Sequence, residues 1–163
     1  MTAPKLGRYE IDTKHSAITF RTRHLFGLAP VRGRFALRAG AVDVTEPASA
    51  SRVHAEIEAG SFRTGNPARD AVVKSRRFLN ADRHPVMIFD SGRCQMNELA
   101  GSLTVQGVTR PVTLTLESLD PSPGSFTARA TTRIDRTEFG VTASRGMAGR
   151  YLSLVLDIRC VRA

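Results

Sequence analysis

Apolar and polar residues alternate through most of this chain from Ser16 onward, and no other feature constrains its fold so strongly. Because successive side chains of a β-strand point to opposite faces, the alternation predicts strands with one buried and one solvated face. Val31, Phe35 and Leu37, for example, alternate with arginines along one such segment. Segments of this kind cover residues 16–23, 31–39, 53–59, 86–91, 101–105, 112–117, 126–134 and 152–160, with 9–12 as a short initial strand. We expect about eight antiparallel strands.

Turn residues separate these segments. Pro or Gly occurs in each of the stretches 45–49, 106–111 and 120–124, where the chain is expected to reverse. No linker or internal repeat divides the sequence. Residues 1–8 are therefore expected to be an N-terminal extension and residues 9–163 a single domain.

One long stretch departs from the period of two. Residues 68–79 contain neither Gly nor Pro, and Asn66-Pro67 before them suits the start of a helix. We expect a short helix there and a second helical turn at residues 136–140. The fold class predicted is all-β with one or two short helices.

The expected inward face of the strands is rich in small residues. Many short antiparallel strands form a sandwich or a closed barrel, and about eight strands leave a barrel either just filled or with room for one small ligand. The chain has no Trp to fill the centre. The small inward residues are Gly33, Ala39, Ala55, Ala59, Gly101, Ala128 and Ala130. Together they favour a hollow interior.

The chain is basic, with a formal net charge of +9. Such a balance permits binding to nucleic acid or to an anionic membrane. Arg21, Arg23, Arg32, Arg34 and Arg38 fall on the expected outward faces of two successive strands. This patch lacks the interleaved aromatic residues that stack on bases, so nucleic acid is the weaker expectation. Transient contact of these arginines with an anionic membrane surface is the better-supported expectation. The simpler alternative is that the arginines are only solvated.

The first eight residues contain no apolar segment of the kind found in a secretory signal, so a cytoplasmic location is expected. No apolar run approaches the roughly 18 residues of a membrane-spanning helix. Cys94 and Cys160 are too few for a disulfide scaffold. Both are expected to be buried, reduced thiols.

Neither a catalytic centre nor a metal site is expected. The four histidines lie in separate segments without the spacing of metal ligands, and no nucleophile elbow, phosphate loop or pair of acids is present. Asp12, His15 and Ser16 look like a catalytic group, but neighbouring residues on a strand point to opposite faces. Structural hydrogen bonding is the better interpretation of this group.

Several short motifs follow one another in a fixed order. They are Tyr9-x-Ile11-Asp12-x-x-His15-Ser16-x-Ile18-x-Phe20, His24-x-Phe26-Gly27, Val31-x-Gly33-x-Phe35, Ser61-Phe62-x-Thr64, Arg69-Asp70 leading to Phe78, His84-Pro85-x-Met87-x-Phe89, the run from Gly101 to Leu114, and Arg136-x-x-Phe139-Gly140. With these motifs the chain resembles the YceI-like family of polyisoprenoid-binding, lipocalin-like proteins, from about Tyr9 to Val161. Arg150 departs from the pattern, since relatives usually have an acidic residue there.

The resemblance implies an eight-stranded antiparallel lipocalin-like β-barrel whose elongated apolar interior holds a long-chain isoprenoid lipid or an isoprenoid quinone. The proteins of this family tend to be dimers, so a homodimer is a partner assembly that the resemblance allows. No other cofactor and no metal is expected from the residues. The function expected is non-catalytic binding, storage or transport of that ligand. The alternatives are a basic surface that binds anionic membrane or nucleic acid, and an enzyme that acts on an isoprenoid or other apolar substrate.

The residues expected to contact the ligand are mostly large and apolar. They are Phe20, His24, Phe35, Met87, Phe89, Leu103, Leu114, Phe126 and Phe139. Each buried CH₂ group of a ligand contributes about 0.8 kcal/mol, so such a lining suits a long hydrocarbon. His24, Thr22 and Ser91 are expected to orient a polar head group at the mouth of the barrel. For any single apolar residue, ordinary core packing is the alternative.

Overall fold

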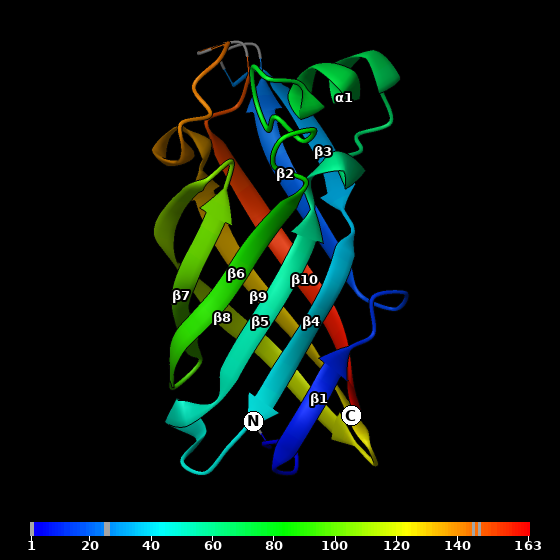
Figure 1. Ribbon diagram of the computed structural model, residues 1–163, viewed down its shortest axis with the longest axis vertical. Helices are drawn as coiled ribbons and strands as arrows, with labels where there is room; N and C mark the ends of the chain where they lie inside the picture. Colours follow the sequence, from blue (N-terminus) through cyan, green and yellow to red (C-terminus); the bar gives the residue numbers. More distant parts are fainter. Residues whose placement is uncertain (1, 25–26, 145, 147) are drawn as a thin grey trace.

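Backbone hydrogen bonds join the strands into one closed ring in the computed structural model, which describes residues 2–24, 27–144, 146 and 148–163 (Figure 1). The strands are β1 (Gly7–Ile11), β2 (Ala17–His24), β3 (Ala29–Phe35), β4 (Leu37–Val44), β5 (Arg52–Glu58), β6 (Val86–Gln95), β7 (Glu98–Val105), β8 (Val108–Ser122), β9 (Ser125–Asp135) and β10 (Tyr151–Arg162). The helix α1 (Pro67–Lys74) and the 3₁₀ turns η1 (Ala48–Ala50), η2 (Ala59–Ser61) and η3 (Arg136–Phe139) lie between them.

The ten strands occupy eight positions around the ring. β1 and β2 pair with successive parts of β10, so they act as one interrupted strand. β4 pairs with β1 and β3 pairs with β2, so these two form a second interrupted strand. The pairing of β1 with β10 closes the ring. The eight-stranded antiparallel barrel expected from the sequence is confirmed.

β-Bulges shift the alternation of side chains at three points of the ring. They lie between Leu37 and Ala39 in β4, in β6 after Ser91, and in β8 after Leu116. The prediction that Ala39 faces inward is wrong, because the bulge leaves Ala39 exposed and turns Val42 toward the interior instead. A bulge inserts one extra residue, so every position beyond it changes face.

Helix α1 and the loops beside it lie at the upper end of the barrel in Figure 1, opposite the two chain termini. The helix begins where the sequence indicates: the Asn66 side chain accepts a hydrogen bond from the amide of Arg69 at 3.1 Å, and Pro67 takes the first turn. It ends at Lys74. Asp70 is buried and accepts hydrogen bonds from both the amide and the hydroxyl of Thr64. The Arg69-Asp70 pair therefore anchors the loop that precedes the helix.

The second helical turn expected at residues 136–140 is η3, and Gly140 ends it with a φ of 76°, a conformation that favours glycine. No helix within the described ranges is long and apolar enough to span a bilayer.

One part of the ring lacks a regular hydrogen-bond ladder. β8 and β9 pair only from Thr115 and Thr131 to the turn that joins them, and the described residues above this point form no ladder with each other. There β8 stays paired with β7 and β9 with β10, so the two pairs diverge. A hydrogen bond from the Thr132 hydroxyl to the Thr113 carbonyl, at 2.9 Å, crosses the gap. This gap, between residues 108–114 and 132–135, is termed the β8–β9 seam.

The seam should be visible in hydrogen exchange. In an antiparallel strand alternate amides point to each neighbour, so amides of residues 108–114 that face β9 should exchange faster than those that face β7. From Leu116 to Ser122 β8 pairs with β9 and no longer with β7, so there the amides that face β9 should be the protected set. Amide exchange followed by NMR measures this, and equal protection of both sets above Thr115 would show that backbone hydrogen bonds close the seam in solution.

Candidate ligand-binding cavity

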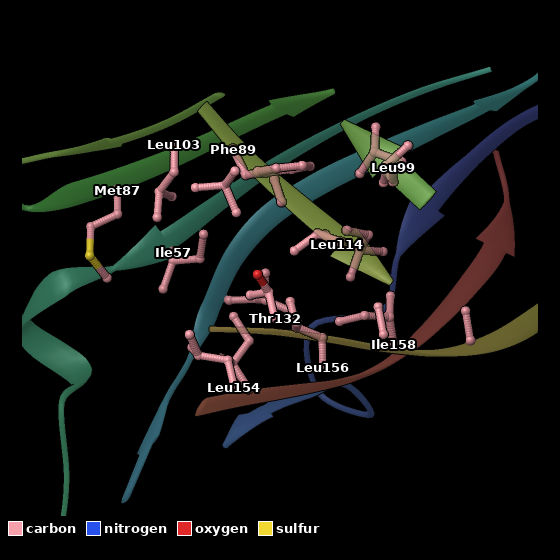
Figure 2. Close-up of a pocket in the computed structure, with 18 of the residues that line it drawn as sticks. Ile57, Met87, Phe89, Leu99, Leu103, Leu114, Thr132, Leu154, Leu156 and Ile158 are labelled. Carbon is pink, nitrogen blue, oxygen red and sulfur yellow. The ribbon is translucent and has the colours of Figure 1, made fainter. Parts of the chain in front are cut away.

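The inward faces of all ten strands enclose a cavity of about 390 Å³ along the barrel. Figure 2 shows Phe89 and Leu103 on one side of it and Leu154 and Leu156 on the other, pointing toward the same space. Leu, Ile, Val, Phe, Met and Ala side chains form nearly the whole wall. The volume lies within the range of roughly 300–1,000 Å³ that is usual for ligand pockets.

Buried side chains close the upper end of the cavity. Phe78, from the loop after α1, meets Phe139 of η3 and Val141 there, and all three are at most 6% exposed. The guanidinium of Arg136 lies in the same wall, 5.4 Å from the Phe78 ring centre. It donates hydrogen bonds to the carbonyls of Val141 and Gly149, both at 2.7 Å. The buried charge of Arg136 is thus used to hold the loop after η3 over the barrel end.

The lower end of the cavity has an exposed rim. Ala48 of η1, Asn97 of the β6–β7 turn and Glu98, the first residue of β7, line the cavity and are exposed to solvent. Ser51, at the start of β5, lies beside them. Ala3 and Pro4 of the N-terminal segment also line the cavity, and Pro4 is buried. The lower end is thus partly exposed and partly polar, whereas the upper end is buried.

Most of the side chains expected to contact a ligand lie in this wall. They are Phe35, Met87, Phe89, Leu103, Leu114, Phe126 and Phe139. Six of them are on strands with the face that the alternation predicts, and Phe139 reaches the wall from η3. Whether they contact a ligand stays a prediction.

Phe20 and His24 do not reach the cavity. Phe20 is buried behind the wall, where its ring stacks on Phe62 with 5.3 Å between centres and tilts against Phe35 at 5.7 Å. His24 is the last residue of β2, at the tip of the β2–β3 hairpin. Phe26 of the second motif lies outside the described residues.

Thr22 and Ser91, the polar residues expected at the mouth of the barrel with His24, form hydrogen bonds with backbone groups instead. The Thr22 hydroxyl donates to the carbonyl of Tyr151 at 2.7 Å. The Ser91 hydroxyl accepts a hydrogen bond from the amide of Val53, also at 2.7 Å, and is buried beside the bulge in β6. Neither is part of the cavity wall, so neither is placed to orient a head group there.

The small inward residues have two different roles. Ala55, Ala128 and Ala130 line the cavity and leave room in it. Gly33 instead gives space to a phenylalanine, since a Cβ atom there would lie 2.4 Å from Cζ of Phe20. Gly101 gives space to the neighbouring strand, since a Cβ atom there would lie 2.5 Å from the carbonyl oxygen of Asp90 and 2.7 Å from Cζ of Phe89. Ala59 is buried but is not part of the wall, so the prediction that it contributes to the hollow is wrong.

The alternation places Thr132 on an inward face, but sequence reasoning did not single out the polar members of the wall. Thr132 is in the middle of it (Figure 2), where its hydroxyl donates to Thr113 across the seam. Arg136 lies in a motif of the family but was not assigned to the wall, and Asn97 and Glu98 lie at a turn without a distinctive signal. Which end of the barrel stays open depends on how the loops fold over it, which alternation does not encode.

A second hollow of about 380 Å³ lies at the β8–β9 seam. It includes the polar residues Thr113, Thr115, Arg133 and Asp135. Four residues belong to both hollows: Val112, Thr132, Ile134 and Phe139. The cavity and the seam are thus separated by single side chains.

The histidine groups show the geometry of structural contacts. Asp12 accepts hydrogen bonds from His15 Nδ1 at 2.8 Å and from Arg159 at 2.7 Å, where the chain passes from β1 to β2. The Ser16 hydroxyl accepts from the Arg159 amide at 2.9 Å. Among the described residues no cluster of His, Cys, Asp and Glu is arranged to hold a metal ion. The prediction that these residues are strand neighbours with opposite directions is wrong, because they lie in the turn between β1 and β2, where Asp12 and His15 meet. The contacts stabilise the break between the two strands.

Arg150, the departure from the family pattern, pairs with Asp135 at 3.0 Å. Burial raises the pKa of Asp135, but hydrogen bonds from Thr137 and Arg150 outweigh this and bring it below its usual value. Arg150 also lies 5.2 Å from the ring centre of Tyr151. The arginine therefore ties the loop before β10 to the end of β9.

Comparison with known proteins gives relatives of similar length. A model of the YceI-like domain matches residues 9–160. A UPF0312 protein of Pseudomonas paraeruginosa is 32% identical over 168 residues, which cover 94% of this chain and 86% of that protein. A UPF0312 protein of Yersinia enterocolitica is 33% identical, with 95% of this chain and 86% of that protein covered.

Two solved structures have the same fold. A polyisoprenoid-binding domain from Saccharophagus degradans, implicated in plant cell wall breakdown, gives a TM-score of 0.75 at 12% identity and covers 98% of this chain and 100% of its own. BcnA of Burkholderia cenocepacia gives a TM-score of 0.73 at 18% identity, over 91% of this chain and 98% of its own. At these identities the likeness concerns the fold.

Cys160 reports on the wall of the cavity. Burial raises the pKa of its thiol to about 12, and the side chain is 1% exposed. Cys94, also expected to be buried, is partly exposed. Because the thiolate is the reactive form, iodoacetamide at pH 8 should alkylate Cys94 and spare Cys160 until the protein is unfolded. Peptide mass spectrometry with and without denaturant measures this. Equal alkylation of both thiols in the folded protein would contradict the buried position of Cys160.

His54, on the outer face, predicts a pH dependence of stability. Its Nδ1 lies 2.5 Å from Asp90 and its Nε2 3.1 Å from Glu56. Hydrogen bonds with Asp90 and then Glu56 raise the pKa of His54 above the usual 6.5. The stabilisation is complete below the unfolded-state pKa of about 6.5 and is lost as the pH rises through the raised folded-state pKa.

Asp90→Asn should lower the pKa of His54 toward its usual value and remove part of this pH dependence. NMR titration of the imidazole and urea unfolding on both sides of the titration measure the two effects. Glu98→Gln, a carboxylate at the cavity rim, is the control. A His54 titration unchanged by Asp90→Asn would refute the pairing.

Proposed function

Because the chain belongs to the YceI-like family, we propose that it binds one long-chain isoprenoid lipid or isoprenoid quinone in the barrel cavity and stores or transports it unchanged. The observation that carries the proposal is the continuous apolar wall, which draws on every strand of the ring. The polyisoprenoid-binding domain from Saccharophagus degradans, which shares this fold, supports the class of ligand.

The wall favours hydrocarbon over polar ligands. In the part of the wall between the rim and Arg136, the polar side chain is that of Thr132. Its hydroxyl already donates a hydrogen bond to the carbonyl of Thr113. A polar group of a ligand placed there would lose its hydration without gaining a partner. Each buried CH₂ group contributes about 0.8 kcal/mol, so a chain of several isoprene units binds well without any charged contact.

The two ends of the cavity suggest an orientation. A chain that enters at the lower rim would place its apolar end against Phe78 and Phe139, which are buried. Its polar head would then stay at the exposed rim, near Asn97 and Glu98. This position replaces the one that the sequence suggested at His24.

An enzyme is less well supported. The hydroxyl of Thr132 donates to Thr113, burial raises the pKa of the Cys160 thiol to about 12, and Arg136 holds backbone carbonyls. Catalysis by the wall would need a nucleophile beside a base, and these three groups provide no such pair. The homodimer and the cytoplasmic location stay predictions.

Organic extraction of the purified protein followed by mass spectrometry tests the proposal. We expect a prenyl lipid or quinone in about one copy per barrel. Incubation with that lipid should return it unchanged. A chemically altered lipid would indicate an enzyme, and an extract without any prenyl compound, together with no uptake of added prenyl lipid, would refute the proposal.

Filling the cavity should displace the ligand. Ala130→Phe places a ring in the wall, and displacing the equivalent of two buried CH₂ groups should weaken binding by about tenfold. Ala100→Phe is the matched control, because Ala100 is exposed on the outside of β7. Uptake of a fluorescent prenyl lipid measures both, with circular dichroism to verify folding. Equal uptake by the two folded variants would place the ligand outside this cavity.

A further inference from the structure

A row of arginines crosses the upper outer face of four neighbouring strands. The strand register places Arg133 of β9 beside Ser153 of β10, Ser153 beside Arg21 of β2, and Arg21 beside Arg32 of β3. All four residues are exposed. Residues paired across strands share a face, so these arginines point to the same side of the barrel.

Further arginines extend the row. Arg34 follows Arg32 on the same face, and two backbone hydrogen bonds of 2.9 and 3.1 Å join it to Arg63. Arg23 lies next to the tip of the β2–β3 hairpin, whose strands appear in the upper half of Figure 1. These side chains are termed the basic face: Arg21, Arg23, Arg32, Arg34, Arg63 and Arg133.

No carboxylate in the described part of the chain forms an ion pair with the basic face. Acidic partners are found for arginines elsewhere, such as Arg8, Arg129 and Arg159. The sequence has no acidic residue between Asp12 and Asp43, a stretch that contains all of β2 and β3. Like charges directly opposite in a ladder destabilise a sheet, so an anionic partner would relieve this repulsion.

An apolar side chain stands among these charges. Leu28, in the turn before β3, is 82% exposed. Apolar residues flanked by arginines suit the boundary between lipid headgroups and acyl chains. A single-stranded nucleic acid would instead need free aromatic rings, but Arg133 already lies 4.0 Å from the ring centre of Tyr151.

The basic face also borders the β8–β9 seam. Arg133 belongs both to the arginine row and to the hollow at the seam. That hollow shares Val112 and Thr132 with the wall of the cavity. Arg133 thus places one end of the arginine row beside a gap in the described ladder, where Asp135 and Glu138 also lie. The side chains behind this gap are shared with the apolar cavity, which favours a lipid surface as the partner.

We propose that the basic face docks the barrel on the surface of an anionic phospholipid bilayer, with Leu28 entering the headgroup layer. The arginines supply long-range attraction, which salt weakens. Leu28 supplies a short-range apolar contact, which salt does not weaken. The contact does not require a loaded cavity.

Sedimentation with vesicles tests the charges. Wild type should bind phosphatidylcholine vesicles that contain phosphatidylglycerol and not pure phosphatidylcholine. Arg21→Gln/Arg32→Gln/Arg34→Gln should weaken this binding on the order of 100-fold. The control Lys5→Gln/Arg52→Gln/Arg93→Gln removes the same charge from exposed residues away from the basic face and should stay within about threefold of wild type. Equal losses in both variants would mean that net charge alone acts, and would refute the proposal.

Leu28→Trp tests the depth of the contact. The chain has no Trp of its own, so the new side chain is the sole indole reporter. Its emission should shift to the blue when anionic vesicles are added and not with neutral ones. An unshifted emission while the protein sediments with vesicles would refute the proposed orientation.

Two further results separate this proposal from its alternatives. Ala130→Phe should dock like wild type even where it loses the ligand, so the cavity and the basic face can fail independently. A thirty-nucleotide DNA strand should compete poorly with anionic vesicles. Binding of that DNA that depends on Arg21, Arg32 and Arg34, with no vesicle binding, would assign the basic face to nucleic acid and overturn the proposal.

Discussion

Closure of the barrel between β1 and β10 is the interaction on which the rest of the structure depends. Only three residue pairs form this ladder, from Tyr9 with Arg162 to Ile11 with Cys160. Side chains reinforce it: Arg162 donates to the hydroxyl of Tyr9 at 3.2 Å, and the Tyr9 ring meets Phe126 edge-on at 4.9 Å. Because the ring is closed, inward-pointing side chains on opposite sides of the barrel face each other across its axis. Small inward residues such as Ala128 then leave a cavity in the barrel. In a sandwich, the two sheets could instead move closer together and fill that space.

The sequence predicted this fold well wherever the alternation is unbroken. β9 and β10 turn the expected residues inward along their whole length, from Phe126 to Ile134 and from Leu152 to Cys160. It failed at Ala39, where one extra residue in the bulge of β4 reverses the faces beyond it. A bulge is set by how two strands meet, which the alternation of one strand does not contain.

The sequence predicted most of the residues that line the cavity, but not where the cavity opens or where its wall is interrupted. Seven of the nine expected contacts lie in the wall, because each is a large apolar residue that reaches the interior. Phe20 is on the inward side as well, but Gly33 gives it room to stack on Phe62, so it packs behind the wall. The open rim at Asn97 and the seam at Thr132 depend on contacts between distant segments, which periodicity does not report.

A hollow barrel lacks the dispersion contacts that a filled core would make. The hydrogen bonds between its strands must therefore provide more of the stability of the fold. An apolar ligand would provide the missing partner atoms for residues such as Leu114 and Leu154, so loading and stability are linked in this architecture. The linkage is uneven around the ring. At the seam, strands β8 and β9 are joined by the Thr132 hydroxyl and not by a ladder, so that part of the wall has the least backbone support and gains most from a ligand on its inner side. On the outer side of the same gap, Arg133 lies beside the carboxylates of Asp135 and Glu138, so charge alone does not weaken the wall there, and the missing ladder is what makes this part depend on a ligand.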